Sequence, residues 1–282
     1  MMTTIPQLTL NDGVRMPQVG FGVFQVPDDE AQRAVETALA AGYRSIDTAM
    51  IYGNEVGVGR ALAAAGIPRE DLFVTTKLWV ADLGAGRARA ALEASLDRLG
   101  LDHVDLYLIH WPAPETDSYL QTWGEMQDLR GDGTRSIGVS NFLPEHLDRL
   151  AGVGSTPPSV NQIELHPALQ NRDTVAANRR QDIATEAWSP LAQGAALDSA
   201  AVTAAAARHG VTPAQIVLRW HLQHGTIVIP KSVTPSRIAA NLDLFGFSLD
   251  DAEVAAIDAL EADGRTGPHP AAFNGCGHRG AS

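Results

Sequence analysis

The sequence feature that most constrains the fold is a regular alternation of short apolar runs with helical patterns along nearly the whole chain. Eight of these runs are predicted strands, and most are separated by one helical pattern of roughly 10–15 residues. Strands that alternate with helices at this spacing form a parallel sheet, and eight of them favour closure into a (β/α)8 TIM barrel of the α/β class. The predicted strands cover residues 19–24, 45–47, 72–77, 104–110, 136–140, 160–163, 183–187 and 226–229.

Further elements are expected outside this repeat. An Asn-Asp-Gly turn signal between two short apolar runs predicts an N-terminal β-hairpin over residues 8–18. The interval between the last two strands holds an extra helix, whose start is marked by a capping box at 212–215. A last helix is predicted over 251–260 with Ser248 as its cap. Since no linker or low-complexity tract interrupts the chain, we expect a single barrel domain over residues 1–282.

Composition excludes several classes of partner. Hydrophobic residues make up 45% of the chain and charged residues 19%, which predicts a large buried core. The net charge is −12 and no basic run is present, so neither nucleic acid nor an anionic membrane surface is an expected partner. The N-terminus does not resemble a signal peptide, and no apolar run is long enough to span a membrane. The single Cys276 cannot form an internal disulfide, which fits a cytoplasmic location.

Polar residues recur where the predicted strands end. In a (β/α)8 barrel these carboxyl ends meet at one mouth, which is where such enzymes carry their active sites. For any one of these residues an ordinary structural role is the more frequent explanation. Their recurrence at nearly every strand is what favours a functional site. The residues are Asp47, Lys77, His110, Ser140, Asn141, Gln162, Trp188, Ser189, Pro190, Lys231 and Ser232.

Several other chemistries lack their sequence signatures. The pair of glycines at 20 and 22 is followed by Gln25, so no G-x-G-x-x-G fingerprint is present, and no phosphate-binding P-loop occurs. No His/Cys cluster has zinc-ligand spacing, and no G-x-S-x-G nucleophile elbow occurs. Among strand ends only Asp47 and Glu164 supply carboxylates, so no metal site is expected.

Four residues at one barrel mouth would form a specific acid catalyst. Tyr52 follows the strand that ends at Asp47, although an acid that caps a helix and a tyrosine at an interface would also explain this stretch. A lysine ammonium such as Lys77 lowers the pKa of a nearby phenol, and a carboxylate keeps the lysine charged. His110 would orient a carbonyl oxygen or help to move the proton. Given a hydride source, this set suits the reduction of an aldehyde or ketone.

These residues and their contexts resemble the aldo-keto reductase superfamily from Leu8 to about His269. Within it, the chain is most similar to bacterial 2,5-diketo-D-gluconate reductases, through residues 51–55, residues 218–223 and its short connecting loops. The motifs that carry the resemblance are GYRSIDTAMIYGNE (42–55), LYLIHWP (106–112), IGVSNF (137–142), VNQIELHP (160–167) and IPKS (229–232).

The resemblance implies a role for each matching residue. Tyr52 would be the general acid, with Asp47 and Lys77 as its tuning pair, while His110 would orient the substrate. The nicotinamide carboxamide would be held by Ser140, Asn141 and Gln162. The nicotinamide ring would stack on Trp188, and the pyrophosphate would lie against Ser189 and Leu191. The adenosine end would be held by Lys231, Ser232, Val233, Arg237 and Asn241, with Lys231 and Arg237 favouring the 2′-phosphate of NADPH.

The resemblance also indicates the substrate pocket, which would be lined by Phe24, Ala49, Trp79, His110 and Trp111. The loop over 193–198 is short, which predicts an open site. The C-terminal tail, residues 268–282, either lacks order or folds over the pocket.

We therefore expect a monomeric, NADPH-dependent carbonyl reductase acting on a small-molecule aldehyde or ketone. Candidate substrates are 2,5-diketo-D-gluconate or a similar keto-sugar acid, methylglyoxal, keto esters and aromatic aldehydes. A non-catalytic NADP(H)-binding or regulatory protein on the same scaffold is the main alternative. A barrel lyase that needs no cofactor is a third possibility.

Overall fold

The central element of the computed structural model, which describes residues 5–275, is an eight-stranded parallel sheet. Its strands follow one another in space in chain order from β3 to β10. Val19, just before β3, forms a parallel bridge to Val228 in β10, and the Gly20 N–H donates to the Val228 carbonyl at 2.8 Å. The sheet therefore closes into the predicted (β/α)8 barrel. The strands are β3 (Phe21–Gly22), β4 (Ser45–Asp47), β5 (Phe73–Leu78), β6 (Val104–Ile109), β7 (Thr134–Ser140), β8 (Val160–Glu164), β9 (Ala184–Trp188) and β10 (Ile227–Val228).

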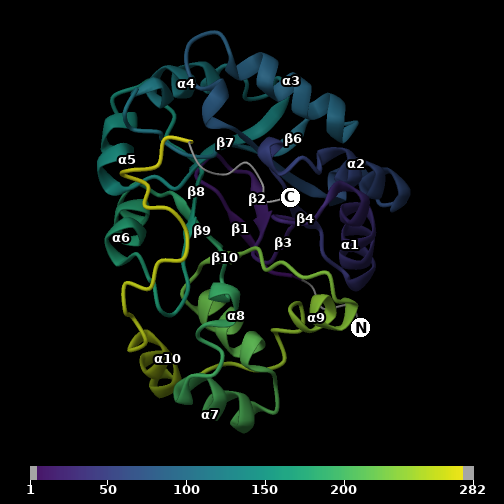
Figure 1. The fold of residues 1–282 in the computed structure, drawn as a ribbon, viewed down its shortest axis with the longest axis vertical. Coiled ribbons are helices and arrows are strands. Elements are labelled where there is room, and N and C mark those ends of the chain that lie inside the picture. The colour runs from purple at the N-terminus through teal and green to yellow at the C-terminus, as the bar shows by residue number, and fades with distance from the viewer. Residues whose placement is uncertain (1–4, 276–282) are drawn as a thin grey trace.

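Helices surround the strands, as Figure 1 shows. In α1 the buried side chains recur at helical spacing and form one apolar stripe that faces the sheet. Within residues 5–275 no helix is both long and apolar enough to cross a bilayer. The helices are α1 (Asp28–Ala41), α2 (Glu55–Ala64), α3 (Ala88–Leu99), α4 (Ser118–Gln127), α5 (Pro144–Leu150), α6 (Arg172–Arg180), α7 (Ala200–His209), α8 (Pro213–Gln223), α9 (Pro235–Ala240) and α10 (Asp251–Asp258).

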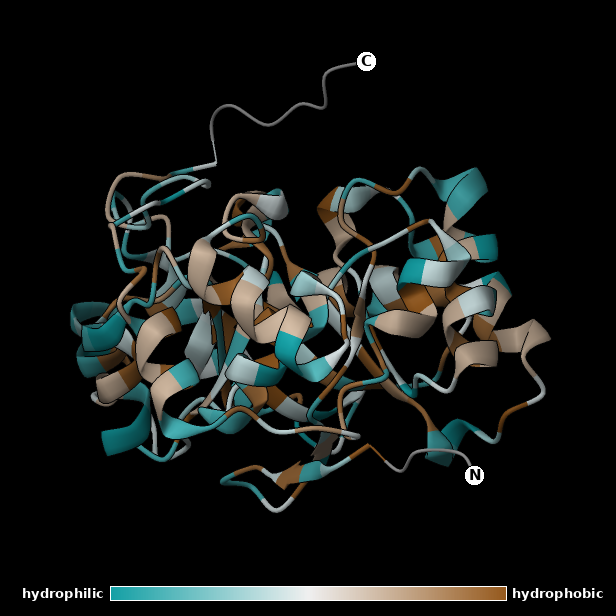
Figure 2. Cartoon of the chain, turned by 90° about the horizontal axis from the view of Figure 1, so that it is seen from below, coloured by the Kyte–Doolittle hydropathy of each residue, from teal (hydrophilic) through white to brown (hydrophobic). Residues whose placement is uncertain are grey.

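The predicted hairpin consists of β1 (Gln7–Thr9) and β2 (Arg15–Pro17), with Leu8 opposite Met16. Leu10 and Met16 pack against inward-facing side chains of the barrel strands, in a cluster that includes Phe73. The hairpin thus covers one end of the barrel, and Figure 2 shows it at the opposite end of the molecule from the last described residues. This arrangement leaves the other end of the barrel for the site.

The outer helices differ in detail from the sequence expectations. The capping box at 212–215 is present, with the Thr212 hydroxyl accepting from the Gln215 N–H. The prediction that Ser248 caps the last helix was wrong. Asp250 is the N-cap, because its carboxylate accepts the Glu253 N–H at 2.9 Å and Glu253 donates no such contact to Ser248. Helices α6, α7 and α9 were not predicted. Helix α6 is mostly polar, and only three of its side chains are buried.

Candidate active site

Strand ends bring the predicted catalytic residues together. Asp47 ends β4, Lys77 lies near the end of β5, and His110 directly follows β6. The Lys77 ammonium donates to the Asp47 carboxylate at 2.6 Å and to the Thr48 carbonyl at 2.9 Å. The same ammonium lies 5.2 Å from the centroid of the Tyr52 ring, and that ring lies edge-on to the His110 imidazole at 5.6 Å. The four side chains therefore form one contiguous group.

A short anchored turn places Tyr52 at this mouth. Tyr52 ends a 3-10 helix, η1 (Met50–Tyr52), and Gly53 follows it with a φ of +67°, a conformation that glycine adopts readily. The Asn54 amide then donates to the Val23 carbonyl at 2.9 Å and accepts from the Thr48 hydroxyl at 2.8 Å. Asn54 is completely buried, so the turn that carries the phenol is tied to two neighbouring strand ends.

The charges in this group differ from the sequence expectation at Tyr52. Burial raises the pKa of Tyr52 to about 12, and this outweighs the lowering that Lys77 causes. Lys77 lowers this pKa as expected, but burial has the larger effect, and the phenol is protonated at neutral pH. Burial also lowers the pKa of Lys77, but the nearby Asp47 and Tyr52 offset this, so the lysine pKa lies above its ordinary value. Lys77 is a buried cation that stays charged.

His110 is a neutral imidazole at physiological pH. Burial lowers its pKa well below the ordinary value, and the Lys77 charge lowers it further. Its ring is 7% exposed and packs edge-on against Trp79 at 5.1 Å. A neutral ring offers one N–H donor and one acceptor. This favours hydrogen bonding to a carbonyl oxygen over carrying a proton as an imidazolium.

The residues predicted to hold the nicotinamide form one hydrogen-bonded network. The Asn141 amide donates to the His110 carbonyl at 3.0 Å and to the Ser140 hydroxyl at 3.1 Å. The Ser140 hydroxyl donates to the Gln162 carbonyl at 2.9 Å. The Trp188 indole N–H donates to the Asn141 side-chain oxygen at 2.8 Å, which fixes the plane of that half-buried ring. Side chains from three neighbouring strands are thus held in one arrangement.

A further acid buried in the barrel, Glu186, was not identified from the sequence. It is completely buried in β9 and lies directly opposite Gln162 in the strand register. The Gln162 side-chain nitrogen donates at 2.8 Å both to Asp47 and to Glu186. The signal that identifies it is its position two residues before Trp188, because alternate residues of a strand face the same side.

Several residues predicted to line the substrate pocket are aromatic and pack together. Trp79 and Trp111 are each under a tenth exposed and belong to one apolar cluster. Phe24 is 46% exposed and its ring centroid lies 5.0 Å from that of Tyr52. Ala49, which was also predicted to line the pocket, is completely buried.

The C-terminal segment supplies a pocket residue that sequence analysis did not identify, Phe273. Its ring centroid lies 4.4 Å from that of Trp111 and 6.1 Å from that of Trp79. The part of the tail that the structure describes, residues 268–275, therefore packs against two of the residues predicted to line the pocket. Residues 276–282, including Cys276, lie outside the described part of the chain. No periodic pattern marks this segment, so no sequence signal pointed to Phe273.

One buried acid fixes this segment to the barrel. Glu164 at the end of β8 accepts from the Thr266 N–H and hydroxyl at 2.6 and 2.5 Å, and from the Gly267 N–H at 3.1 Å. Gly267 lies so close to the Trp188 indole that an added Cβ would approach it at 2.5 Å. The last segment thus contacts the ring predicted to face the nicotinamide.

The loop after β9 carries the residues predicted to contact a pyrophosphate. Ser189 has a φ of +47°, and its carbonyl accepts from the Ala192 N–H at 2.8 Å, which closes a tight turn. The buried His221 imidazole donates to the Pro190 carbonyl at 3.0 Å. Leu191 is half-buried within this turn. The loop therefore has a defined shape beside Trp188.

The residues predicted for the adenosine end lie in α9 and directly on either side of it. Lys231 and Arg237 are exposed, and neither forms an ion pair with any residue in the 5–275 range. Asn241 is buried at the end of α9, and the Ser232 hydroxyl accepts from the Thr234 N–H at 3.1 Å. Two cations are thus available to an anionic group. Without the family resemblance, both would have been interpreted as ordinary surface residues.

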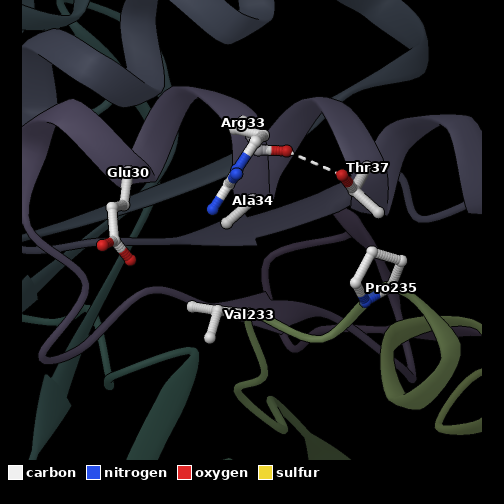
Figure 3. A pocket seen from close by; sticks show the side chains of 6 residues that line it. All are labelled: Glu30, Arg33, Ala34, Thr37, Val233 and Pro235. Atoms are coloured by element: carbon white, nitrogen blue, oxygen red, sulfur yellow. Dashed lines mark hydrogen bonds between the residues drawn. The ribbon is translucent and has the colours of Figure 1, made fainter.

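A hollow of about 160 Å³ adjoins this region. It lies between α1 and the segment that leads into α9, and Figure 3 shows the Arg33 side chain extending from α1 toward Val233. The 45% exposed Val233 forms its apolar floor together with Pro235. One of the predicted adenosine contacts, Val233, therefore lines a concave surface. The described residues hold no cluster of three His, Cys, Asp or Glu side chains suited to a metal ion.

Comparison with protein families gives a match over most of the chain. The model of the aldo/keto reductase family matches residues 18–262. A protein of Mycolicibacterium smegmatis named as an aldo-keto reductase is 52% identical over 270 residues, which cover 95% of this chain and 98% of that protein. A Yersinia pestis protein named methylglyoxal reductase DkgA is 52% identical over 275 residues, 96% of this chain and 99% of its own length.

Solved structures agree with this match. The crystal structure of an aldo/keto reductase from Brucella melitensis has a TM-score of 0.89 and 49% identity, and the alignment covers 92% of this chain and 100% of that one. The structure of a Gox0644 mutant in complex with NADPH has a TM-score of 0.92 and 44% identity, covering 96% and 99%.

Proposed function

Since the chain belongs to the aldo/keto reductase family, we propose that it reduces an aldehyde or ketone with Tyr52 as the general acid. Membership makes it an NADPH-dependent oxidoreductase. The observation that carries the proposal is the buried Lys77 ammonium, which lies between the Asp47 carboxylate and the Tyr52 ring. A cation buried beside a phenol is costly unless it stabilises a charge that forms there.

The residues present fit NADPH. Gln162 has both amide hydrogens engaged, so it keeps an acceptor for a carboxamide N–H. Trp188 has its indole plane fixed by a hydrogen bond and is half-buried, so it offers a face for ring stacking. Lys231 and Arg237 are exposed cations suited to a 2′-phosphate, with Ser232, Val233 and Asn241 beside them. When bound, the cofactor supplies the hydride that the carbonyl carbon accepts.

The groups around the carbonyl oxygen account for the delivery of the proton. The neutral His110 orients that oxygen by hydrogen bonding, and the Tyr52 hydroxyl donates its proton as negative charge develops there. An alkoxide is a stronger base than a phenolate, so a tyrosine with a pKa of about 12 still transfers its proton favourably. Lys77 stabilises the phenolate that remains, and Asp47 keeps Lys77 charged. The carbonyl becomes an alcohol, and the phenolate regains a proton from water.

The pocket supports small carbonyl substrates. Trp79, Trp111, Phe273 and Phe24 give it aromatic walls beside His110. A relative named methylglyoxal reductase makes methylglyoxal the first candidate, and 2,5-diketo-D-gluconate and other keto-sugar acids follow from the motif resemblance. We also propose a monomer, with residues 1–282 as one cytoplasmic domain. Size-exclusion chromatography with light scattering tests the monomer.

A binding titration and a turnover assay test the proposal. Tryptophan fluorescence should be quenched by NADPH more tightly than by NADH, and Lys231→Ala should narrow this difference by about tenfold, because one charge-assisted contact to phosphate is lost. Turnover of a carbonyl panel should fall by about 10²–10⁴-fold in Tyr52→Phe, with NADPH affinity kept.

The alternatives give different results. Tight NADPH binding without reduction of any carbonyl would favour a non-catalytic NADP(H)-binding protein. If neither nucleotide bound, the reductase proposal would be wrong, and a lyase that needs no cofactor would become the better hypothesis.

A further inference from the structure

The buried acid Glu186 has no part in the proton path described above. It lies in β9 directly opposite Gln162, and both side chains are within 2% of complete burial. Its Oε2 accepts from the Gln162 side-chain nitrogen at 2.8 Å, while its Oε1 has no partner among residues 5–275. A buried acid in a strand interior is costly, so its single specific contact requires an explanation.

The contact fixes the orientation of the Gln162 amide. That side-chain nitrogen carries two hydrogens, and one is donated to Asp47 and the other to Glu186, both at 2.8 Å. If the amide were flipped, its oxygen would face the acceptor-only carboxylate of Asp47, and the two amide hydrogens would lose their acceptors on Asp47 and Glu186. Gln162 can therefore present only its carbonyl oxygen to a ligand.

We propose that Glu186 is a positioning residue for NADPH, which orients Gln162 so that its Oε1 accepts from the carboxamide N–H of the nicotinamide. The inference rests on the proposed function, because it assumes that Gln162 faces this carboxamide. It adds a residue that acts through Gln162 and makes no contact with the cofactor itself. The ligand feature that Glu186 selects is the N–H donor of the carboxamide.

The charges around Glu186 agree with this role. The groups that face it are Asp47 from β4, Lys77 from β5 and Tyr52 from η1, in addition to Gln162. Burial raises the pKa of Glu186, and the neighbouring Asp47 charge raises it further. The acid is therefore neutral at physiological pH and keeps a carbonyl oxygen as the acceptor for Gln162. The positive charge of Lys77 is then balanced by the single negative charge of Asp47.

The test compares two ligands that differ only at the carboxamide. One is NADP⁺, and the other is its 3-acetylpyridine analogue, in which a methyl group replaces the NH2. Affinities are measured by fluorescence titration for wild type, Glu186→Met and Glu186→Gln. Glu186→Met fills a similar volume without an acceptor, whereas Glu186→Gln keeps an acceptor in the same place.

Glu186→Met should weaken NADP⁺ binding by about tenfold and change binding of the analogue little, because the lost contact involves only the N–H donor. Glu186→Gln should restore the wild-type ratio of the two affinities. Lys231→Ala is the matched control, because it should weaken both ligands equally and leave the ratio unchanged.

An equal loss for both ligands in Glu186→Met would overturn the inference, since it would indicate a general packing role. The same conclusion follows if Glu186→Gln fails to restore the ratio. If wild type bound neither ligand, the proposed function itself would fail. If wild type bound both ligands and Glu186→Met left their ratio unchanged, only the inference would fail. If Glu186→Met does not fold, the ratio of the two affinities is measured in Glu186→Ala instead. The same change in that ratio is expected.

Discussion

Replacing Glu186 by glutamine should make the protein more stable, by an amount that grows with pH. In the unfolded chain this carboxyl titrates near its ordinary pKa of 4.5, whereas burial in the folded barrel raises the pKa to about 8. The folded state therefore holds the proton more tightly. Its stability is unaffected by this group below about pH 4.5 and decreases as the pH rises toward about 8. Glutamine keeps the shape of the neutral acid and has no such titration.

The magnitude follows from the size of this shift. Each pKa unit corresponds to about 1.4 kcal/mol, so Glu186 lowers the free energy of unfolding by about 3 kcal/mol at pH 7 and by less than about 1 kcal/mol at pH 5. Because the side chain is completely buried, no reduction for solvent screening applies. We expect urea denaturation to show that Glu186→Gln has a higher free energy of unfolding than wild type. This difference should be larger at about pH 7 than at about pH 5 by about 2 kcal/mol.

An equal difference in free energy of unfolding at both pH values would refute the reasoning. A Glu186→Gln variant less stable than wild type at pH 7 would refute it as well. Glu55→Gln is a suitable contrast, since Glu55 is an equally buried acid that has a cation partner. It accepts from Arg98 at 2.6 Å and from Thr76 at 2.5 Å. Removing its charge should lower the free energy of unfolding at neutral pH by about 1–3 kcal/mol.

Three other substitutions test separate parts of the structure. Asp47→Asn removes the charge that keeps the Lys77 pKa high, so turnover should fall about 10²-fold and the pH–rate profile should shift; an unshifted profile would contradict the role of Asp47. Phe273→Ala removes one side of the aromatic cluster, so KM for an aromatic aldehyde should rise about tenfold while kcat for methylglyoxal changes little. Equal effects on the two substrates would argue against a pocket role. Gly59→Ala places a methyl group against the Leu99 carbonyl where α2 meets α3, so Tm should drop by several degrees in thermal denaturation, and an unchanged Tm would show that the contact is loose.

Residues at strand ends could be placed from the sequence because the barrel itself brings them together. Once alternating strands and helices predict a parallel barrel, Asp47, Lys77 and His110 must share one mouth, whatever the outer helices do. Helix α6, by contrast, was not recognisable, because its segment is mostly polar and only three of its side chains are buried. Its position depends on packing against β9 and α5, which no local pattern records.

Burial and irregular segments account for what the sequence did not reveal. The raised pKa of Tyr52 depends on how much water the folded mouth excludes, and this outweighs the effect of the lysine beside it. Glu186 stands in a strand with few β-branched residues, where an acid is usually taken to face solvent. Phe273 lies in a segment without helix or strand, so only the folded chain shows that it reaches Trp111.

Closure of the barrel has a consequence for how the chain folds during synthesis. The Gln18 side chain donates to the Thr226 carbonyl across a separation of 208 residues, beside the bridge that joins the first and last strands. Contacts this distant in sequence form slowly, because a long loop must close before they provide any stabilisation. Until β10 leaves the ribosome, β3 and β9 are unpaired sheet edges that can pair with other chains. A nascent chain of this protein is therefore most prone to aggregation just before its last strand emerges.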